Sequence, residues 1–533
     1  MDLIISNLRI PIEQDGLAAY TRAASEILKI SPSAVALVKI LSKSLDATLA
    51  DQFYYRLSIA VNVPDHVDNP AGFPLYSASP ERLRITKTTP LRPVIIGFGP
   101  AGMFAALELL DCGLMPLIFE RGKKLEDRDL DVQKFIKERT LNPESNIQFG
   151  EGGAGSYSDG KLFSRINNSD HANRVLDTLI RFGAPDEIGY ISKPHLGTDV
   201  LCRIVRNIRN HILEQGGEIH YSAKLTDLKV EDGAVSRIVI NGGQEYPVSH
   251  LYLAIGHSAR DTFAMLHEKG IALEQKPISV GVRIEHPAET INRIRYGEKY
   301  QNYPSLGAAT YSFNHTNRVI GRGVYTFCMC PGGEIVNASP ESGCLVLNGM
   351  SYSRRASAFS NSALVVSCHT SDYSSSHPLA GFDFQRAIER KAFESTGRGW
   401  KAPAQNLVDF LDGRLSTVLN PNSCKMGTVP VALNELFPDF VSEALLSAFA
   451  HWRDAYPLFV SEHAVLLAPE TRTSSPVRIK RNERFESVNV KNLFPIGEGS
   501  GYTGGITSSA IDAIKAVEFT TQRCSAGGSG SAG

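Results

Sequence analysis

A glycine-rich hexapeptide between a short apolar strand and a helix constrains this chain more than any other feature. Gly97-Phe98-Gly99-Pro100-Ala101-Gly102 follows the apolar residues 93–96 and precedes a helical pattern over 101–112. In such a turn the first glycine permits a tight bend, and the second lets the backbone come close to a pyrophosphate. The third lets the helix pack closely on the strand. The helix N-terminus then presents its N–H groups and its positive dipole end to phosphates.

A second apolar strand over 115–120 completes the β-α-β pattern and ends in Glu120, whose carboxylate can accept hydrogen bonds from ribose hydroxyls. Arg121 and Gly122 follow directly, an arrangement more typical of FAD proteins than of NADP proteins, which place a basic residue where this acid stands. A structural turn without a ligand is the alternative. The predicted FAD-binding residues here are Gly97, Gly99, Pro100, Ala101, Gly102, Glu120 and Arg121.

A second glycine cluster covers residues 150–161. Its glycines let backbone amides crowd an anion or a flat ring, and Ser158 and Lys161 can bond flavin oxygens or a negatively charged N1. The alternative is a mobile linker with a solvated lysine. We expect Gly152, Gly153, Ser158 and Lys161 to contact the cofactor.

A third cluster, residues 492–510, combines an apolar strand, glycines and a helix over 513–519. It would bring Glu498 to a ribityl hydroxyl and the helix N-terminus to the flavin pyrimidine edge. The alternative is another strand-turn-helix without a ligand. The predicted contacts are Gly497, Glu498, Gly504, Gly505 and Ile506, together with Gly256, which closes a strand over 251–255.

These patterns predict an α/β protein with a discontinuous, Rossmann-like FAD-binding domain of the glutathione-reductase type. We expect a small N-terminal α+β domain over 1–88, the FAD-binding domain over 89–261 and 476–524, and an inserted α+β substrate or cap domain over 262–475. The Ser/Ala/Gly-only residues 525–533 read as a linker or tag. Within these parts we expect a helical region over 17–45, a helix over 198–215, and a β-meander whose strands are 218–224, 228–230 and 235–240.

Composition excludes several classes of partner. Lys and Arg total 55 against 56 Asp and Glu, so no net field attracts nucleic acid or an anionic membrane. No apolar run approaches the roughly 18–20 residues that span a bilayer, and the N-terminus lacks a signal-peptide pattern. Eight scattered cysteines suit reduced thiols in a cytoplasm. The sequence predicts a cytoplasmic protein with a small-molecule substrate, no metal, no nucleic-acid partner and no membrane partner, and leaves its oligomeric state open.

Three side chains are catalytic candidates: Arg472, His257 and Lys161. An arginine in the segment 470–476 could bind a substrate carboxylate bidentately, although the same segment could be a salt-bridged loop. A histidine beside a turn is as often structural as catalytic. Cys328 and Cys330 lie in a strand-like run, which favours core packing, and their spacing is not that of redox-active dithiols.

Several stretches together resemble a family of largely uncharacterised bacterial FAD-dependent dehydrogenases, a branch of the glutathione-reductase-type flavoproteins. They are residues 146–162, 193–198, 256–263, 283–287, 323–333, 348–351 and 470–479. The resemblance implies that the chain binds FAD and that its C-terminal segment returns into the first domain. It implies no particular substrate, because the family has no settled one. The chain departs from the family pattern at Thr310-Tyr311-Ser312 and at 424–427, which implies a different substrate if these positions face it.

The function expected from these features is that of an FAD-dependent oxidoreductase, a dehydrogenase or reductase moving hydride between flavin N5 and a small organic substrate. An FAD monooxygenase is one alternative. A non-catalytic flavin-binding regulatory protein that recognises a partner is another. NAD(P)H stays open as electron donor, although no second Gly-x-Gly-x-x-Gly falls on a strand-helix boundary.

Overall fold

The N-terminal part is an antiparallel sheet in the order β1-β3-β2, with one helix packed on it. The computed structural model describes residues 1–65, 72–77, 92–162 and 169–526. The elements are β1 (Asp2–Pro11), α1 (Leu17–Leu28), β2 (Ala36–Asp46) and β3 (Tyr54–Asn62). The expected helix over 17–45 is therefore wrong beyond residue 28. Lys29 ends α1 with a φ of 58°, and β2 gains its backbone hydrogen bonds by pairing with β3, which local periodicity does not reveal.

A parallel sheet in the order β22-β10-β4-β5-β6 carries the first glycine motif. Its strands are β4 (Val94–Ile96), β5 (Leu117–Phe119), β6 (Glu218–His220), β10 (Leu251–Leu253) and β22 (Leu493–Pro495). Helices α2 (Pro100–Asp111), α5 (Gly197–Glu214) and α11 (Ile506–Ala526) pack against one another beside it. Residues 94–96 and 493–495 both flank β10, so the C-terminal segment lies in the same sheet as the first glycine motif. Helix α11 reaches residue 526, and residues 527–533 of the expected tail lie outside the described residues.

The β-meander consists of β7 (Leu225–Glu231), β8 (Ala234–Ile240) and β9 (Gln244–Pro247). Asp232 and Gly233 form the expected hairpin turn, both with positive φ. The expected first strand over 218–224 is wrong, because residues 218–220 pair with β5 at the edge of the parallel sheet. Strand β9 is the third strand of the meander instead.

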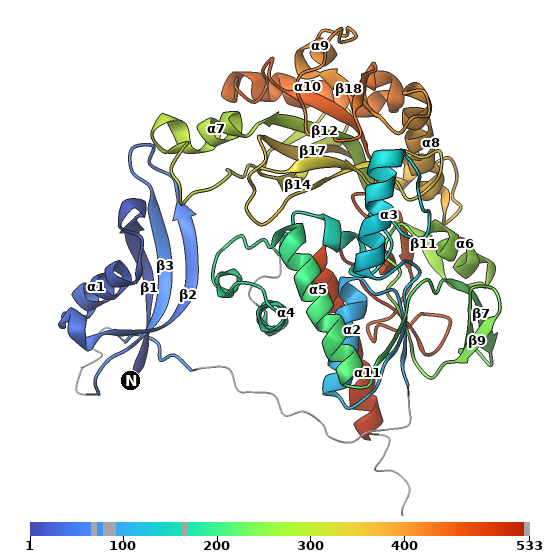
Figure 1. Ribbon diagram of the computed structural model, residues 1–533, viewed down its shortest axis with the longest axis horizontal. Coiled ribbons are helices and arrows are strands. Elements are labelled where there is room, and N and C mark those ends of the chain that lie inside the picture. The colour runs from blue at the N-terminus through green and yellow to red at the C-terminus, as the bar shows by residue number, and fades with distance from the viewer. Residues whose placement is uncertain (66–71, 78–91, 163–168, 527–533) are drawn as a thin grey trace, which may run out of the picture.

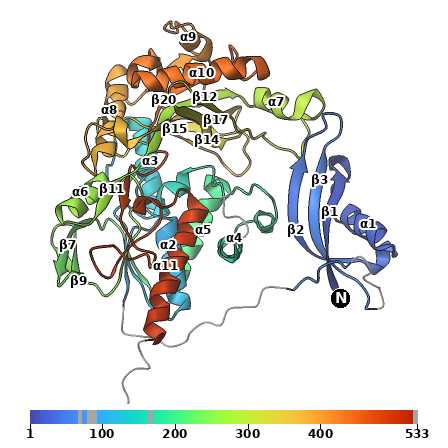
Figure 2. The same cartoon turned by 180° about the vertical axis from the view of Figure 1, so that it is seen from behind.

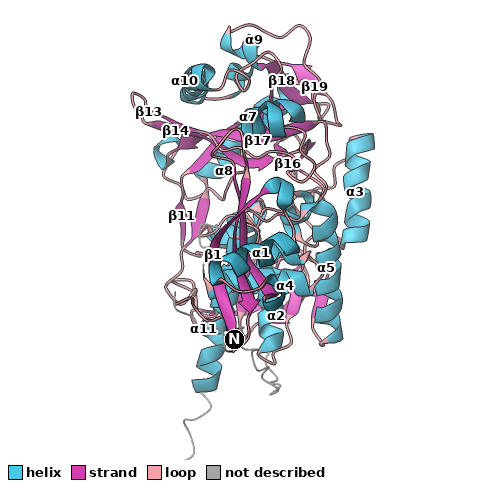
Figure 3. Cartoon of the chain, turned by 90° about the vertical axis from the view of Figure 1, so that its left-hand side faces the viewer, coloured by secondary structure: helices cyan, strands magenta, loops and turns pink. Residues whose placement is uncertain are grey.

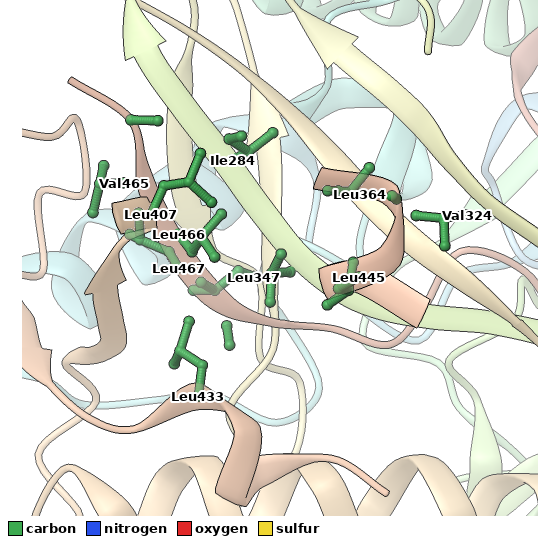
Figure 4. Close-up of a cluster of buried hydrophobic side chains, with 14 of the residues drawn as sticks. Ile284, Val324, Leu347, Leu364, Leu407, Leu433, Leu445, Val465, Leu466 and Leu467 are labelled. Carbon is green, nitrogen blue, oxygen red and sulfur yellow. The ribbon is translucent and has the colours of Figure 1, made fainter. Parts of the chain in front are cut away.

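The largest sheet has the order β13-β14-β17-β12-β20-β18-β19. Its strands are β12 (Ile278–Pro287), β13 (Asn314–Asn317), β14 (Arg322–Cys330), β17 (Phe359–Cys368), β18 (Ala402–Asn406), β19 (Thr428–Pro430) and β20 (Val465–Glu470). The surrounding helices are α7 (Ala288–Tyr300), α8 (Ala380–Ser395), α9 (Leu407–Leu411) and α10 (Asp439–Ala455). Strand β12 is buried along almost its whole length. Figure 4 shows the aliphatic core that Ile284, Leu364 and Leu466 form with neighbouring side chains.

The remaining elements connect these layers. They are α3 (Leu125–Glu138), α4 (Asp170–Arg181), α6 (Arg260–Glu268) and the strand pairs β11 (Leu273–Gln275) with β21 (Val477–Ile479) and β15 (Glu334–Asn337) with β16 (Leu347–Met350). In Figures 1 and 2 the large sheet lies above α2, α5 and α11, with the N-terminal sheet to one side. Figure 3 shows α3 and α5 on the side of the molecule opposite β11.

Among the described residues, the N-terminal part contacts the rest of the molecule through α7 and through residues 190–192. Phe53 stacks on Tyr300 of α7 with ring centroids 4.3 Å apart, and Lys43 of β2 exchanges backbone hydrogen bonds with Tyr190 and Ser192. Over the described part of the chain, no helix has the length and apolar character needed to cross a membrane.

Substituting Gly102 tests how α2 packs on β4. A Cβ at this position would lie 2.0 Å from the carbonyl oxygen of Gly97, and backbone cannot move aside easily. We expect Gly102→Ala to lower the free energy of unfolding by about 1–3 kcal/mol, measured by denaturant unfolding of the cofactor-free protein. Gly504→Ala is the matched control, because its Cβ would meet nothing within 4 Å. Equal stability of the two variants would contradict this account of the third motif glycine.

Candidate functional site

A cavity of about 1150 Å³ lies where the three glycine clusters meet beneath the large sheet. Most of the side chains and backbone positions singled out from sequence line it. They are Gly97, Gly99, Pro100, Ala101, Glu120, Arg121, Gly153, Ser158, Lys161, Gly256, His257, Arg472, Gly497, Glu498, Gly504, Gly505 and Ile506. Gly102 and Gly152 do not line it. Gly102 serves helix packing, and Gly152 is a turn residue with a φ of 83° whose Cβ would meet the Ser156 hydroxyl.

Glu120 joins the first two glycine clusters. Its carboxylate accepts hydrogen bonds from the backbone N–H groups of Phe98 at 2.8 Å, Gly122 at 2.9 Å and Gly150 at 3.0 Å. A carboxylate offers about four lone-pair sites, so one acceptor position remains. The ribose-binding role expected for Glu120 is therefore limited to a single further hydrogen bond.

Arg128 of α3 shapes the second glycine cluster, and sequence reasoning missed it. Its fully buried guanidinium donates to the carbonyl oxygens of residues 146, 147, 151 and 153 at 2.6–3.0 Å. Gly150 has a φ of 125°, and a Cβ there would lie 2.4 Å from Arg128 Cδ. The loop thus needs both an arginine and a glycine. One arginine in a polar helix gives no sequence signal of this role.

The third cluster packs against the first. A Cβ on Gly497 would lie 2.6 Å from the Cβ of Ala101, and a Cβ on Gly499 would lie 2.5 Å from the Gly256 carbonyl oxygen. Asp512 of α11 accepts from the Gly497 N–H at 2.9 Å and from Arg481. Gly504 and Gly505, in contrast, would bring no Cβ within 4 Å of other atoms. The segment before α11 is therefore open toward the cavity.

Lys161 links the second cluster to the large sheet. Its ammonium lies 2.9 Å from Asp159 and donates to the carbonyl oxygen of Met329 in β14. Asp159 is buried and also accepts from Arg355 at 2.7 and 3.1 Å. Burial raises the pKa of Asp159, but Lys161 and Arg355 outweigh it and lower the pKa below its usual value. Asp159 and the Met329 carbonyl oxygen thus fix the ammonium group of Lys161 at the cavity wall.

His257 pairs with the third cluster. Its Nδ1 lies 3.6 Å from the Glu498 carboxylate, and its Nε2 is buried and has no hydrogen-bond partner among the described residues. Both side chains line the cavity. The carboxylate favours the tautomer that carries its proton on Nδ1 and leaves Nε2 as an acceptor.

Arg472 is held by Glu389 of α8. Its Nε and Nη2 donate to the two oxygens of Glu389 at 3.0 and 2.9 Å, and Arg260 of α6 donates to the same two oxygens at 2.9 Å. The two nitrogens expected to bind a substrate carboxylate already bind Glu389, which is the arrangement of the salt-bridged loop that the sequence leaves as the alternative. Its Nη1 is buried and without a partner among the described residues.

Glu470 lines the cavity and is paired with Arg283, which is buried behind it. Arg283 of β12 donates to Glu470 of β20 at 2.9 Å, to Asn361 of β17 at 2.9 Å and to the carbonyl oxygen of Cys328 in β14 at 3.0 Å. Burial raises the pKa of Glu470, although Arg283 partly opposes that shift. The cavity therefore contains a buried carboxyl group whose pKa lies above its usual value.

The expectation that Cys328 packs in the core is wrong. Cys330 is buried, but Cys328 is exposed and lines the cavity. Cys328 has a φ of 44°, and the pairing of β14 with β17 shifts register between Phe327 and Cys330. Such a bulge turns a side chain out of the alternation that a regular strand imposes.

The two departures from the family pattern lie elsewhere. Neither residues 310–312 nor residues 424–427 line the cavity. Tyr311 stacks edge-on against Phe459, and Cys424 is buried beside Glu285. A substrate difference is therefore not carried by direct cavity contacts at these positions.

Comparison with known proteins identifies the class of cofactor. Residues 277–473 match a family model described as "FAD-dependent protein, C-terminal domain-like". An uncharacterized protein of Clostridium beijerinckii is 42% identical over 535 residues, which covers 98% of this chain and 99% of that one.

Solved structures similar in part include three flavoproteins. The flavin-dependent brominase Bmp2 is 14% identical with a TM-score of 0.35, covering 82% of this chain and 79% of that one. A quinol fumarate reductase FrdA variant of E. coli is 12% identical with a TM-score of 0.36, covering 84% and 72%. CtdE in complex with FAD is 10% identical with a TM-score of 0.31, covering 80% and 83%.

The cofactor of this chain is FAD, and the cavity fits it. Gly99 and Gly153 face each other, since a Cβ on either would lie 3.1–3.6 Å from the other's Cα. The two glycine loops thus place their backbones side by side at the N-terminus of α2, where both can approach a pyrophosphate. At the far end, the open segment of Gly504 and Gly505 before α11 suits the flavin ring.

Replacing Arg128 tests whether it holds the second glycine cluster in a cofactor-binding shape. We expect Arg128→Met to retain less FAD, at least about tenfold weaker binding, because four carbonyl groups lose their donor. The measurement is the FAD-to-protein ratio after gel filtration at several FAD concentrations. Arg139→Met is the control, since Arg139 donates to Ile136 and Met426 outside the cavity. Full FAD occupancy in Arg128→Met would refute this role.

The Glu389 cluster predicts a pH dependence of stability. Burial alone would raise the pKa of Glu389, but Arg260 and Arg472 outweigh it and lower the pKa to about 2. The unfolded chain titrates near its ordinary value, so the stabilisation is complete above about pH 4.5 and disappears as pH falls toward 2.

We therefore expect Glu389→Gln to lose about 3–5 kcal/mol of unfolding free energy at pH 7. The difference from the unsubstituted protein should shrink progressively between pH 4.5 and the lowest pH at which both still fold. Urea unfolding at several pH values measures it. A difference that stays constant with pH would show that the ion pairs do not set the stability.

Proposed function

Since the chain belongs to the same family as the uncharacterized Clostridium beijerinckii protein and residues 277–473 match the model of an FAD-dependent protein, we propose that it is an oxidoreductase. It would move hydride between FAD and a small organic molecule, as a dehydrogenase or reductase. The proposal includes a glutathione-reductase-type FAD domain built on the parallel sheet, into which the large sheet and its helices are inserted as the substrate domain.

One observation carries the proposal. The glycine clusters and a set of polar side chains from the large sheet line the same cavity. Cofactor-binding backbone alone would suit a carrier or regulatory protein. A cavity that also presents Glu470, Lys161, His257 and the thiol of Cys328 offers proton donors and charges beside the flavin site, which a reaction needs and storage does not.

When bound, FAD supplies the acceptor and donor of hydride. The side chains and backbone of the protein position the cofactor and the substrate, and they donate or accept protons. The backbone at Gly99 and Gly153 would hold the pyrophosphate, and the remaining acceptor position of Glu120 would hold a ribose hydroxyl. Glu470 presents its carboxyl group to the cavity, and burial raises its pKa above the usual value, which favours a role as a proton donor. His257, oriented by Glu498, offers Nε2 as a proton acceptor.

Arg472 enters this proposal as a positioning residue. Its guanidinium joins the loop after β20 to α8 through Glu389, and through that carboxylate to Arg260 of α6. It therefore holds Glu470 and Thr473 at the cavity wall, while its own Nε and Nη2 stay bound to Glu389.

Gly99→Val tests the cofactor site directly. Gly99 has an ordinary negative φ of −86°, and its Cβ would make ordinary van der Waals contacts with Gly153, 3.6 Å from Cα and 3.9 Å from N. The fold should therefore tolerate the substitution, while two γ-methyl groups block the approach of a pyrophosphate. We expect a folded, colourless protein with thermal stability close to that of the cofactor-free parent. Stoichiometric FAD in Gly99→Val would place the cofactor elsewhere.

The oxidoreductase proposal itself is tested anaerobically. The FAD-loaded protein should lose its flavin absorbance with one class of organic donor, or its photoreduced form should regain it with one class of acceptor. Glu470→Gln should slow that half-reaction without releasing FAD. A panel of alcohols, amines, thiols, enoates and quinones that changes the absorbance in neither direction would count against an oxidoreductase.

A further inference from the structure

Two cysteines of β14 meet the flavin cavity at the same bulge. Cys328 is exposed to the cavity, Cys330 is buried, and both line it. The Sγ of Cys330 lies 3.3 Å from the carbonyl oxygen of Cys328. Two Cα atoms with one residue between them are roughly 5.5–7 Å apart, and the Cα atoms of a disulfide are about 4.4–6.8 Å apart. The left-handed conformation of Cys328 bends the chain between them.

The bulge is fixed to the flavin site from both sides. Lys161, in the second glycine cluster, donates to the carbonyl oxygen of Met329, the residue between the two cysteines. Arg283 donates to the carbonyl oxygen of Cys328 at 3.0 Å and lies 3.8 Å from the Sγ of Cys330. The cysteine pair is therefore held against the loop that is expected to contact the flavin, with a cation on each side.

Although their spacing differs from that of the usual redox-active dithiols, we propose that Cys328 and Cys330 form a redox-active pair that exchanges two electrons with FAD. This inference rests on the proposed function, because it takes FAD in the cavity. The cysteine pair would deliver electrons to FAD without a second dinucleotide-binding motif. The external partner is a thiol compound that reaches Cys328 through the cavity.

The exchange balances as follows. Both S–H bonds break, the two sulfur atoms join, and two electrons with two protons pass to FAD, giving its two-electron-reduced form. Two external thiol groups then restore the pair. The first attacks Cys328 and releases Cys330 as a thiolate, which takes a proton. The second attacks the mixed disulfide, releases Cys328 and leaves as an external disulfide.

The electrostatics favour electron flow from the thiols to the flavin. The protein around the cavity raises the pKa of Cys328, with Lys161 opposing the shift, and burial raises the pKa of Cys330. The reduced pair is therefore not stabilised as a thiolate, unlike the reduced forms of strongly oxidising dithiols. A pair of this kind gives up its electrons more readily.

The test counts electrons in the FAD-loaded protein. After air oxidation and removal of oxygen, dithionite should deliver four electrons per FAD to the unsubstituted protein and two per FAD to Cys328→Ser and to Cys330→Ser. Alkylation under denaturing conditions should find two fewer free thiols in the oxidised protein than in the reduced one, out of eight cysteines. Cys112→Ser is the control, because Cys112 lies outside the cavity, and it should still take four electrons.

Dithiothreitol serves as the thiol probe. Under anaerobic conditions we expect it to bleach the bound flavin, and we expect the rate to fall at least tenfold in either cavity-cysteine variant while Cys112→Ser keeps it. Two electrons per FAD in the unsubstituted protein, with all thiols free, would overturn the redox pair. In that case full FAD occupancy and reduction by another donor would leave the proposed oxidoreductase function intact, whereas failure to bind FAD would defeat both.

Discussion

The three hydrogen bonds to the Glu120 carboxylate are the constraint on which the cavity depends. They tie the first glycine turn, the end of β5 and the start of the second glycine cluster to one buried charge. Hydrogen bonds to an ionised acceptor are stronger than neutral ones, and leaving a buried carboxylate without partners is costly. The shape of the phosphate-binding backbone is therefore set by the protein itself before any cofactor enters.

Buried arginines likewise join distant segments of the chain, each through several hydrogen bonds to one charged group. Arg128 gathers the carbonyl groups of the second cluster, Arg283 gathers strands β14, β17 and β20 around β12, and the pair of Arg260 and Arg472 shares Glu389 between α6, α8 and the loop after β20. A planar guanidinium with five donors suits such junctions. These contacts bring polar groups from the large sheet to the flavin cavity while keeping nearly every charge paired.

Sequence patterns located the three glycine clusters and most of the regular elements. They failed where pairing partners lie far away in the chain. Residues 36–46 form a strand because β3 offers them hydrogen bonds, and residues 218–220 join the parallel sheet because β5 lies beside them. Local periodicity cannot distinguish these outcomes, since it does not report which backbone groups a folded chain brings together. Arg128 escaped notice for a related reason, because its four acceptors lie on a separate loop.

The glycine motifs alone already require the backbone to turn tightly, or to be approached closely, at particular positions. At Gly97 and Gly150 a positive φ and a clash for any Cβ follow from position in the motif, because only glycine lacks that atom. The tertiary structure decided what the side chains near the cofactor can do. It occupied the fork of Arg472 with Glu389 and turned Cys328 from the expected core into the cavity, because burial and hydrogen-bond partners come from elements distant in the sequence.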